Sequence, residues 1–329
     1  MYKHFYQLQC NPFEITPDPF FLFPTQQHNE ALAALYYGVR MHKGFVVMTG
    51  EVGTGKTLLL RCLLTLLRRC SVSFAYVFNT RLSPLEFIRY VAADLGLVVS
   101  GKAKDQLLFD LNAYLLERHR QKLTTLLVVD EAHQVPTPVL EEIRLLTNLE
   151  TARQKLLQIL LVGQPELDQK LDSIDLRQLK QRIALRCHLE PLDPEETSAY
   201  IRRRLQLAGA NSQAVIIFPD DTAATVYRHS RGIPRLINTI CENALVTAYA
   251  RHAAAVTPDM IEEVSADFRL GAVQTPTRVG VEGLGEMRQA IKTTLLQLHD
   301  YLEGFHPKER EPAIAIARTL GPEDHEPYI

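Results

Sequence analysis

The sequence predicts an α/β fold: a five-stranded parallel sheet with helices on both faces, followed by a small all-helical domain. Two observations support this fold. Up to Leu192, short apolar runs without strict alternation are separated by longer amphipathic runs, as in a parallel sheet that helices cover on both faces. After Leu192 only helical patterns follow, which predicts a second domain without strands.

Each element of the first domain has its own local signal. Strands are expected at the strand-length apolar runs 44–49, 73–78, 125–129, 157–162 and 185–190. Helices are expected where apolar residues recur every three or four positions, at 28–41, 56–68, 84–95, 104–120 and 138–149. Residues 1–28 are rich in Phe and Pro and are expected to form an ordered loop that packs on the body of the protein.

The second domain begins with a helix start signal, Asp193-Pro194-Glu195-Glu196, in which an N-cap Asp precedes Pro and two acids. Its helices are expected at 194–208, 219–230, 234–251 and 258–267. The predicted organisation is therefore a nucleotide-binding domain with the aromatic N-terminal segment, a helical lid, a linker, an amphipathic helix and a disordered tail, at 1–192, 193–270, 271–283, 284–305 and 306–329.

The composition is that of a globular protein. Of 329 residues, 46% are hydrophobic and 22% are charged, and 36 Lys and Arg against 38 Asp and Glu leave a net charge of −2. These values exclude a wholly disordered chain and argue against a polybasic nucleic-acid binder. The five cysteines have no C-x-x-C spacing, which predicts reduced, mostly buried thiols in a cytoplasmic protein. No apolar span reaches the roughly 18 residues of a transmembrane helix, so none is predicted.

The run Gly50-Glu51-Val52-Gly53-Thr54-Gly55-Lys56-Thr57 matches G-x-x-x-x-G-K-[ST] between a predicted strand and a predicted helix. Glycines allow backbone N–H groups to surround a phosphate, and the helix N-terminus adds partial positive charge. Lys56 can reach the outer phosphates of a nucleotide, and the Thr57 hydroxyl can bind Mg²⁺. The sequence therefore predicts a nucleotide site that runs from Gly50 to Leu58.

The predicted strand 125–129 ends in Asp130-Glu131, which delivers two carboxylates to the edge of the sheet where the phosphate loop lies. Asp130 is expected near Mg²⁺, and Glu131 is expected to polarise the attacking water as a general base. His133 is expected to begin the next helix without a catalytic role.

Four further polar residues are candidates for the same chemistry. Gln164 follows strand 157–162 and can hold the water or the γ-phosphate. Arg235 opens a helix of the second domain and can reach back to the γ-phosphate of its own chain. Arg182, with Arg186 as the alternative, lies in a basic stretch that can supply an arginine finger to a neighbouring subunit.

Taken together, GEVGTGKT, LLVVDEAH, LLVGQPEL, LKQRIALRCHLEPL and GIPRLIN occur in an order that resembles the ExeA-like AAA+ ATPases of general secretion. The resemblance covers about residues 1–270. It implies a P-loop AAA+ fold that uses ATP and Mg²⁺, with Gly50–Thr57 as Walker A and Asp130 and Glu131 as Walker B. It further implies Gln164 as sensor 1, Arg182 as the finger, Arg235 as sensor 2, and assembly into a ring or filament.

The resemblance leaves two functional hypotheses. The first is an ATPase that drives or regulates assembly of an envelope, secretion or exopolysaccharide machine, located in the cytoplasm or at the inner membrane through protein partners. The second is an ATP-dependent filament or ring on DNA, as in the TnsC-type transposition regulators that share this core. Cations cluster along the chain at 56–69, 176–190 and 225–252, and an ATP phosphate chain accounts for two of these clusters, which leaves little positive charge for another polyanion.

Overall fold

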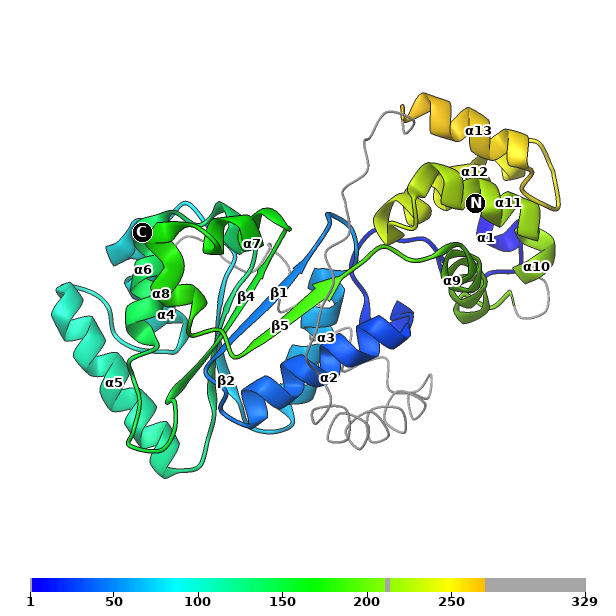
Figure 1. Ribbon diagram of the computed structural model, residues 1–329. Coiled ribbons are helices and arrows are strands. Elements are labelled where there is room, and N and C mark those ends of the chain that lie inside the picture. The colour runs from blue at the N-terminus through cyan, green and yellow to red at the C-terminus, as the bar shows by residue number, and fades with distance from the viewer. Residues whose placement is uncertain (1, 211–213, 270–329) are drawn as a thin grey trace. The chain divides into compact units, whose positions relative to one another are not determined.

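The computed structural model describes residues 2–210 and 214–269 (Figure 1). They belong to a compact unit that spans Met1–Arg278, and a second unit spans Val279–Ile329. The predicted linker 271–283, the predicted helix 284–305 and the predicted tail 306–329 therefore lie outside the described residues.

The sheet has five parallel strands in the order β2-β3-β4-β1-β5, which confirms the predicted class. The strands are β1 (Phe45–Gly50), β2 (Ser73–Val77), β3 (Thr125–Val129), β4 (Leu157–Gly163) and β5 (Leu185–Leu189). Their register aligns the carboxyl ends, because Gly50 lies opposite Leu189 and Val129 lies opposite Leu161. The loops that follow β1, β3 and β4 therefore meet at one edge of the sheet.

Helices cover both faces of this sheet. The helices and 3₁₀ turns of this part are η1 (Pro19–Phe21), α2 (Gln26–Arg40), α3 (Lys56–Arg68), α4 (Pro84–Asp94), α5 (Lys104–Arg120), η2 (Ala132–Gln134), α6 (Thr137–Leu146), α7 (Glu166–Leu171), η3 (Ile174–Leu176) and α8 (Arg177–Lys180). The helices α2 and α3 pack against one face, while α4, α5 and α6 cover the other (Figure 1). Alternate residues of a strand divide between the faces, as in β1, where Phe45 and Val47 join the core under α4–α6.

The helical part consists of α9 (Pro194–Leu207), α10 (Ala214–Ile217), α11 (Asp220–Ser230), α12 (Pro234–Ala250) and α13 (Pro258–Asp267). The predicted start of α9 is a full capping box: the Glu196 amide donates to Asp193 Oδ1 at 2.7 Å, and the Asp193 amide donates to Glu196 Oε2 at 3.1 Å. The four predicted helices of this part are all present, and only the short α10 has no sequence signal.

The first residues of the N-terminal segment pack on the helical part. Its helix α1 (Tyr2–Phe5) packs against α12, and Tyr2, Tyr6 and Phe13 are buried in the same core as α9–α13. Phe13 is fully buried and meets Phe218 edge to face at 5.7 Å. The core of the helical part is therefore built from both the first residues of the chain and residues after Leu192.

Among the described residues, no helix combines the length and the apolarity that crossing a bilayer requires.

Candidate nucleotide-binding site

The phosphate loop connects β1 to α3 and has the backbone that its glycines permit. Gly53 and Gly55 have φ of +85° and +99°, a left-handed conformation that residues with a Cβ rarely adopt. Gly55 is the N-cap of α3, so the first amides of that helix are open to a ligand. At Gly50 a Cβ would lie 2.6 Å from the Leu189 carbonyl oxygen, which requires glycine at the start of the loop.

Lys56 folds back over this loop. Its Nζ donates to the carbonyl oxygens of Gly50 at 2.7 Å and Glu51 at 2.8 Å. Burial lowers the pKa of Lys56, and the nearby carboxylates of Glu131 and Asp130 oppose that shift. The positive charge of this ammonium group is therefore balanced only by carbonyl dipoles within the loop. A bound phosphate would balance it with a full negative charge.

A residue that the sequence analysis did not single out supports the loop from behind. His28 of α2 is buried, and its Nε2 donates to the Thr54 carbonyl oxygen at 3.3 Å. The Thr25 hydroxyl lies 2.7 Å from His28 Nδ1 and caps α2 by accepting from the His28 amide at 3.2 Å. The cap starts α2 at Gln26, two residues before the expected position, and it orients the imidazole toward the loop. Nothing local in the sequence distinguishes this histidine from a surface one.

Asp130 lies at the end of β3 and is buried with both carboxylate oxygens engaged. Its Oδ2 accepts from the Tyr76 hydroxyl at 2.7 Å, and its Oδ1 accepts from the Glu131 amide at 2.9 Å. Burial raises the pKa of Asp130, and these two hydrogen bonds act in the opposite direction. The sequence analysis missed Tyr76, because its place beside Asp130 follows from the pairing of β2 with β3.

Glu131 combines an unusual backbone conformation with an unpartnered carboxylate oxygen. Its φ is +50°, a strained value for a residue with a side chain. Its Oε2 is buried and has no hydrogen-bond partner among the described residues. His133 Nδ1 lies 3.4 Å from Oε2. That nitrogen also accepts from the Gln164 amide at 3.4 Å, so a neutral imidazole has no proton there to give to Glu131. Oε2 is thus an acceptor without a donor among the described residues, at the sheet edge that carries the phosphate loop.

Gln164 lies where the sequence predicts, directly after β4 and next to the Asp130-Glu131 turn. Its backbone N–H donates to His133 Nδ1 at 3.4 Å, and His133 lies in η2, directly after the carboxylates. The Gln164 backbone and the Glu131 carboxylate therefore both lie next to the His133 imidazole.

Arg235 begins α12 and is tied to the phosphate loop. Its amide donates to the Gly53 carbonyl oxygen at 3.2 Å, and a Cβ on Gly53 would lie 2.7 Å from Arg235 Cβ. Its side chain is exposed. The structure thus places the Arg235 backbone against the phosphate loop of its own chain.

Arg182 and Arg186 are not at this site. Arg182 lies between α8 and the start of β5, at the opposite edge of the sheet, where its guanidinium donates to Thr147 Oγ1 and to Asn148 Oδ1 at 2.6 Å. Arg186 lies in β5 and pairs with Asp168 at 2.8 Å. Neither side chain is free to reach the phosphate loop of its own chain.

The residues present fit a magnesium ion held together with a nucleotide. No cluster of three or more His, Cys, Asp or Glu occurs in the part of the chain that the structure describes, so no all-protein metal cage is present there. Mg²⁺ in phosphate-transfer sites is held by one or two protein oxygens plus phosphates and water. Thr57 in the first turn of α3 and Asp130 at the end of β3 can supply those oxygens.

Comparisons with known proteins agree with this geometry. Residues 39–171 match the family model of an AAA domain. The chain carries an AAA+ domain. It is 45% identical over 252 residues to General secretion pathway protein A of Aeromonas hydrophila, a match that covers 76% of this chain and 45% of that protein. The predicted resemblance to the ExeA-like ATPases is thereby confirmed, and the match spans less than half the length of that relative.

Solved structures show the same fold at low identity. The ORC2 protein of Aeropyrum pernix, in ADPNP and ADP complexes, is 18% identical with a TM-score of 0.55, and the match covers 78% of this chain and 71% of that one. The Cdc6p of Pyrobaculum aerophilum is 19% identical with a TM-score of 0.57, over 74% of this chain and 66% of that one. At this identity the similarity establishes the AAA+ fold alone.

Proposed function

We propose that this AAA+ protein binds ATP with Mg²⁺ and hydrolyses it to ADP and phosphate. The observation that carries the proposal is the buried Glu131 Oε2 without a hydrogen-bond partner, at the same sheet edge as the phosphate loop and Asp130. Lys56, the loop amides and Arg235 bind the phosphates, Thr57 and Asp130 hold Mg²⁺, and Gln164 positions the water. The bound ion would supply charge neutralisation on the phosphate oxygens. Glu131 accepts the proton of the attacking water.

A glutamine scan at the sheet edge tests this assignment. Glu131→Gln is expected to bind ATP normally and to lower the hydrolysis rate by about 10²- to 10⁴-fold, the usual contribution of a general base. Glu166→Gln is the matched control, because Glu166 is an exposed carboxylate at the same edge whose charge also acts on Lys56. Hydrolysis and binding of radiolabelled ATP are measured in parallel. Normal turnover in Glu131→Gln, or equal losses in both variants, rejects Glu131 as the base.

We infer further that the protein oligomerises and that its ATP cycle serves a bacterial secretion or envelope machine. The 45% identity to General secretion pathway protein A supports this client class. The test is a chimera in which residues 1–270 of this chain replace the matching segment of that relative in Aeromonas hydrophila. Restored secretion, lost again with Lys56→Ala, is the expected result. A stable chimera that hydrolyses ATP but does not restore secretion rejects the client class.

A further inference from the structure

The edge of the sheet opposite the phosphate loop is strongly basic. It consists of the turns that precede β1, β2, β3 and β4, residues 40–44, 68–72, 117–124 and 150–156, and we call these four turns the basic edge. They carry nine Lys or Arg and two Glu, a net charge of +7 with histidines neutral. Seven of the nine cations are exposed: Arg40, Lys43, Arg68, Arg69, Arg120, Lys122 and Arg153.

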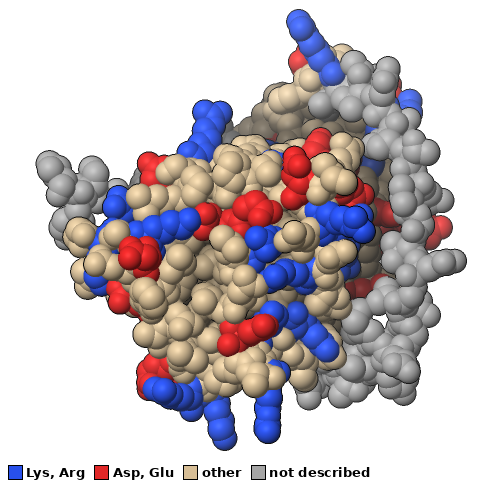
Figure 2. All heavy atoms as spheres, turned by 60° about the vertical axis from the view of Figure 1, so that its left-hand side comes forward, with Lys and Arg blue, Asp and Glu red and all other residues tan. Residues whose placement is uncertain are grey.

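The four turns form one continuous surface. Their strands are neighbours in the order β2-β3-β4-β1. His42 lies between two of the turns, with Nε2 3.5 Å from Thr124 Oγ1 and Nδ1 3.3 Å from Gln158 Nε2 at the start of β4. Arg118 links the 117–124 turn to the 68–72 turn by donating to the Ser71 carbonyl oxygen at 3.0 Å. In Figure 1 this is the lower edge of the sheet, where α2 and α5 end, and Figure 2 shows Lys and Arg side chains projecting along the lower margin.

The opposite edge has the reverse charge. The segments that follow the five strands, 51–56, 78–83, 130–136, 164–168 and 190–196, carry nine Asp or Glu and two Lys or Arg, a net charge of −7. A strand of five residues is about 16 Å long, which exceeds the Debye length of about 8 Å at physiological salt. A negatively charged surface in contact with the basic edge is therefore attracted by it. Its repulsion by the acidic edge is largely screened by salt.

Helix capping explains only part of this charge. Cations in the last turn of a helix are favourable because they oppose the negative end of its dipole, and Arg40, Arg68 and Arg120 are such residues. Lys43, Lys122 and the 150–156 turn lie beyond the helix ends, where this effect is small. The two carboxylates, Glu117 and Glu150, already pair with Arg120 and Lys155. The nine cations of the basic edge therefore exceed its carboxylates by seven.

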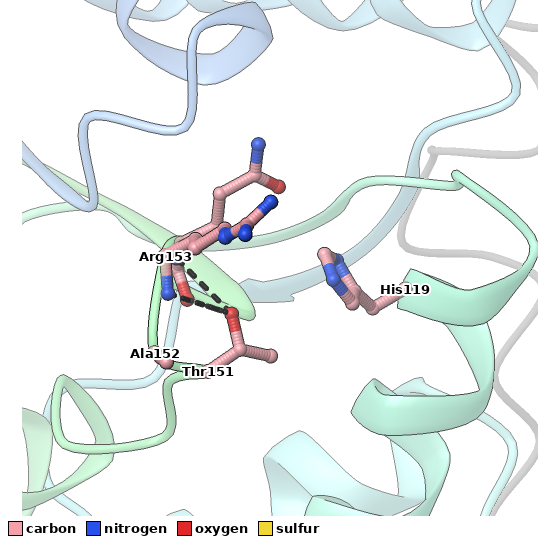
Figure 3. A pocket seen from close by; sticks show the side chains of 5 residues that line it. His119, Thr151, Ala152 and Arg153 are labelled. Atoms are coloured by element: carbon pink, nitrogen blue, oxygen red, sulfur yellow. Dashed lines mark hydrogen bonds between the residues drawn. The ribbon is translucent and has the colours of Figure 1, made fainter.

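A shallow hollow of about 350 Å³ opens on the basic edge between two of its turns (Figure 3). His119, Thr151, Arg153 and Gln154 line it, and the Arg153 and Gln154 amides donate to Thr151 Oγ1 at 3.3 and 3.1 Å. Those bonds fix the shape of the 150–156 turn. The Arg153 and His119 side chains border the hollow, as donors around a phosphate group would.

Two features indicate which polyanion this edge fits. Met41 lies between Arg40 and Lys43 in the sequence, and 58% of its surface is exposed. An exposed apolar side chain among cations is typical of protein surfaces that insert into the headgroup region of a bilayer. The four turns contain no Phe, Tyr or Trp on which a nucleic-acid base could stack. We propose that the basic edge binds the anionic headgroups of a membrane surface directly, with Met41 inserted among them and the nucleotide site facing away from the lipid.

Vesicle sedimentation tests the proposal with the full chain. At about 0.1 M salt, where the Debye length is about 10 Å, the protein is expected to bind vesicles that contain phosphatidylglycerol and not vesicles of phosphatidylcholine alone. The double variant Arg40→Gln/Lys43→Gln is expected to bind about 25-fold more weakly, since each cation near an anionic surface contributes about fivefold, or about 1 kcal/mol. Met41→Ser should also weaken binding, while Met41→Leu should not.

The matched control is Arg89→Gln/Arg203→Gln, which removes two exposed cations of α4 and α9 outside the basic edge. It should bind vesicles like the unaltered protein. ATP hydrolysis without vesicles should be unchanged in all of these variants, so a failure of this proposal is distinguishable from a failure of the proposed ATPase function. Equal binding by the two double variants, or no preference for anionic vesicles, overturns the proposal. Binding of duplex DNA that Arg40→Gln/Lys43→Gln abolishes, without vesicle binding, overturns it in favour of a nucleic acid.

Discussion

At the scale of single residues, the site depends on how Asp130 keeps its charge in a buried position. Burial raises the pKa of this carboxyl, and the Tyr76 hydroxyl, the Glu131 amide and the Lys56 charge oppose the shift. Hydrogen bonds to a charged group contribute about 1.5–3 kcal/mol each. Tyr76 therefore helps to determine the pH range in which Asp130 can hold a metal ion.

Tyr76→Phe is expected to lower kcat/KM for Mg-ATP about tenfold, because one charge-assisted hydrogen bond is lost. The pKa of Asp130 should rise further, so this carboxyl loses its proton only at higher pH, and the acid limb of the activity profile should shift toward higher pH. The measurement is hydrolysis as a function of pH at saturating Mg²⁺. Tyr90→Phe is the control, because Tyr90 packs against Phe78 and does not contact Asp130. An unshifted acid limb in Tyr76→Phe rejects the role of its hydroxyl.

Sequence alone predicts those site residues that form contiguous motifs. Lys56 and Glu131 are recognised because a strand, a loop and a helix follow one another within a few residues. Tyr76 and His28 are not, since each reaches the site through strand pairing or helix packing between segments that are distant along the chain. The roles assigned to Gln164, Arg182 and Arg235 stay predictions, although the structure brings two of these three to the phosphate loop region.

At the scale of elements, strands and long helices agree with the sequence pattern, and the differences are local. The helix expected at 138–149 ends at Leu146, where Thr147 Oγ1 donates to the Arg144 carbonyl oxygen at 2.6 Å and Arg182 contacts the following residues. The segments α7, α8 and the 3₁₀ turns span six residues or fewer, too short to show a helical period. Tertiary contacts determine these boundaries, so local pattern does not predict them.

The turn between α11 and α12 contacts the connection from β5 into the helical part at Gly232. Gly232 has a φ of +75°, and a Cβ there would lie 1.8 Å from the Leu192 carbonyl oxygen. Gly232→Ala is expected to lower the free energy of unfolding by about 1–2 kcal/mol for the left-handed backbone and by about 3 kcal/mol more for the clash. Gly96→Ala is the matched control, because Gly96 has a φ of +84° but nothing within 4 Å of a Cβ. Urea denaturation measures both, and equal losses would contradict a steric role for Gly232.

At the scale of the whole molecule, linear charge clusters are a poor guide to charged surfaces. The sequence shows the cations at 56–69 as one cluster, but this run spans the helix α3, which is about 20 Å long. Lys56 lies at the phosphate loop, and Arg68 and Arg69 lie at the opposite edge of the sheet. One cluster in the sequence is therefore divided between the nucleotide site and the basic edge, which Arg68 and Arg69 join.

The position of Arg182 bears on whether a neighbouring subunit completes the nucleotide site. It lies at the edge of the sheet away from its own phosphate loop, so any contact it makes with a nucleotide belongs to a neighbouring subunit. We expect the specific hydrolysis rate to rise with protein concentration and Arg182→Ala to remain slow at every concentration. Because Arg182 also contacts Thr147, Thr147→Ala is needed to separate loss of that anchor from loss of the cation.

Mixing two inactive variants gives the sharpest form of this prediction. Lys56→Ala subunits retain Arg182 but do not bind ATP, and Arg182→Ala subunits bind ATP but lack the cation. If Arg182 acts on the neighbour, an equimolar mixture contains the productive pair at about one interface in four of a head-to-tail assembly, and hydrolysis should recover to about that fraction of the normal rate. Replacing Arg182→Ala by Arg186→Ala in the mixture tests the alternative cation. If sizing shows that the assembly contains both variants and the mixture is as inactive as its components, action between subunits is excluded. ATP binding and the Arg182 cation would then have to be present in the same chain.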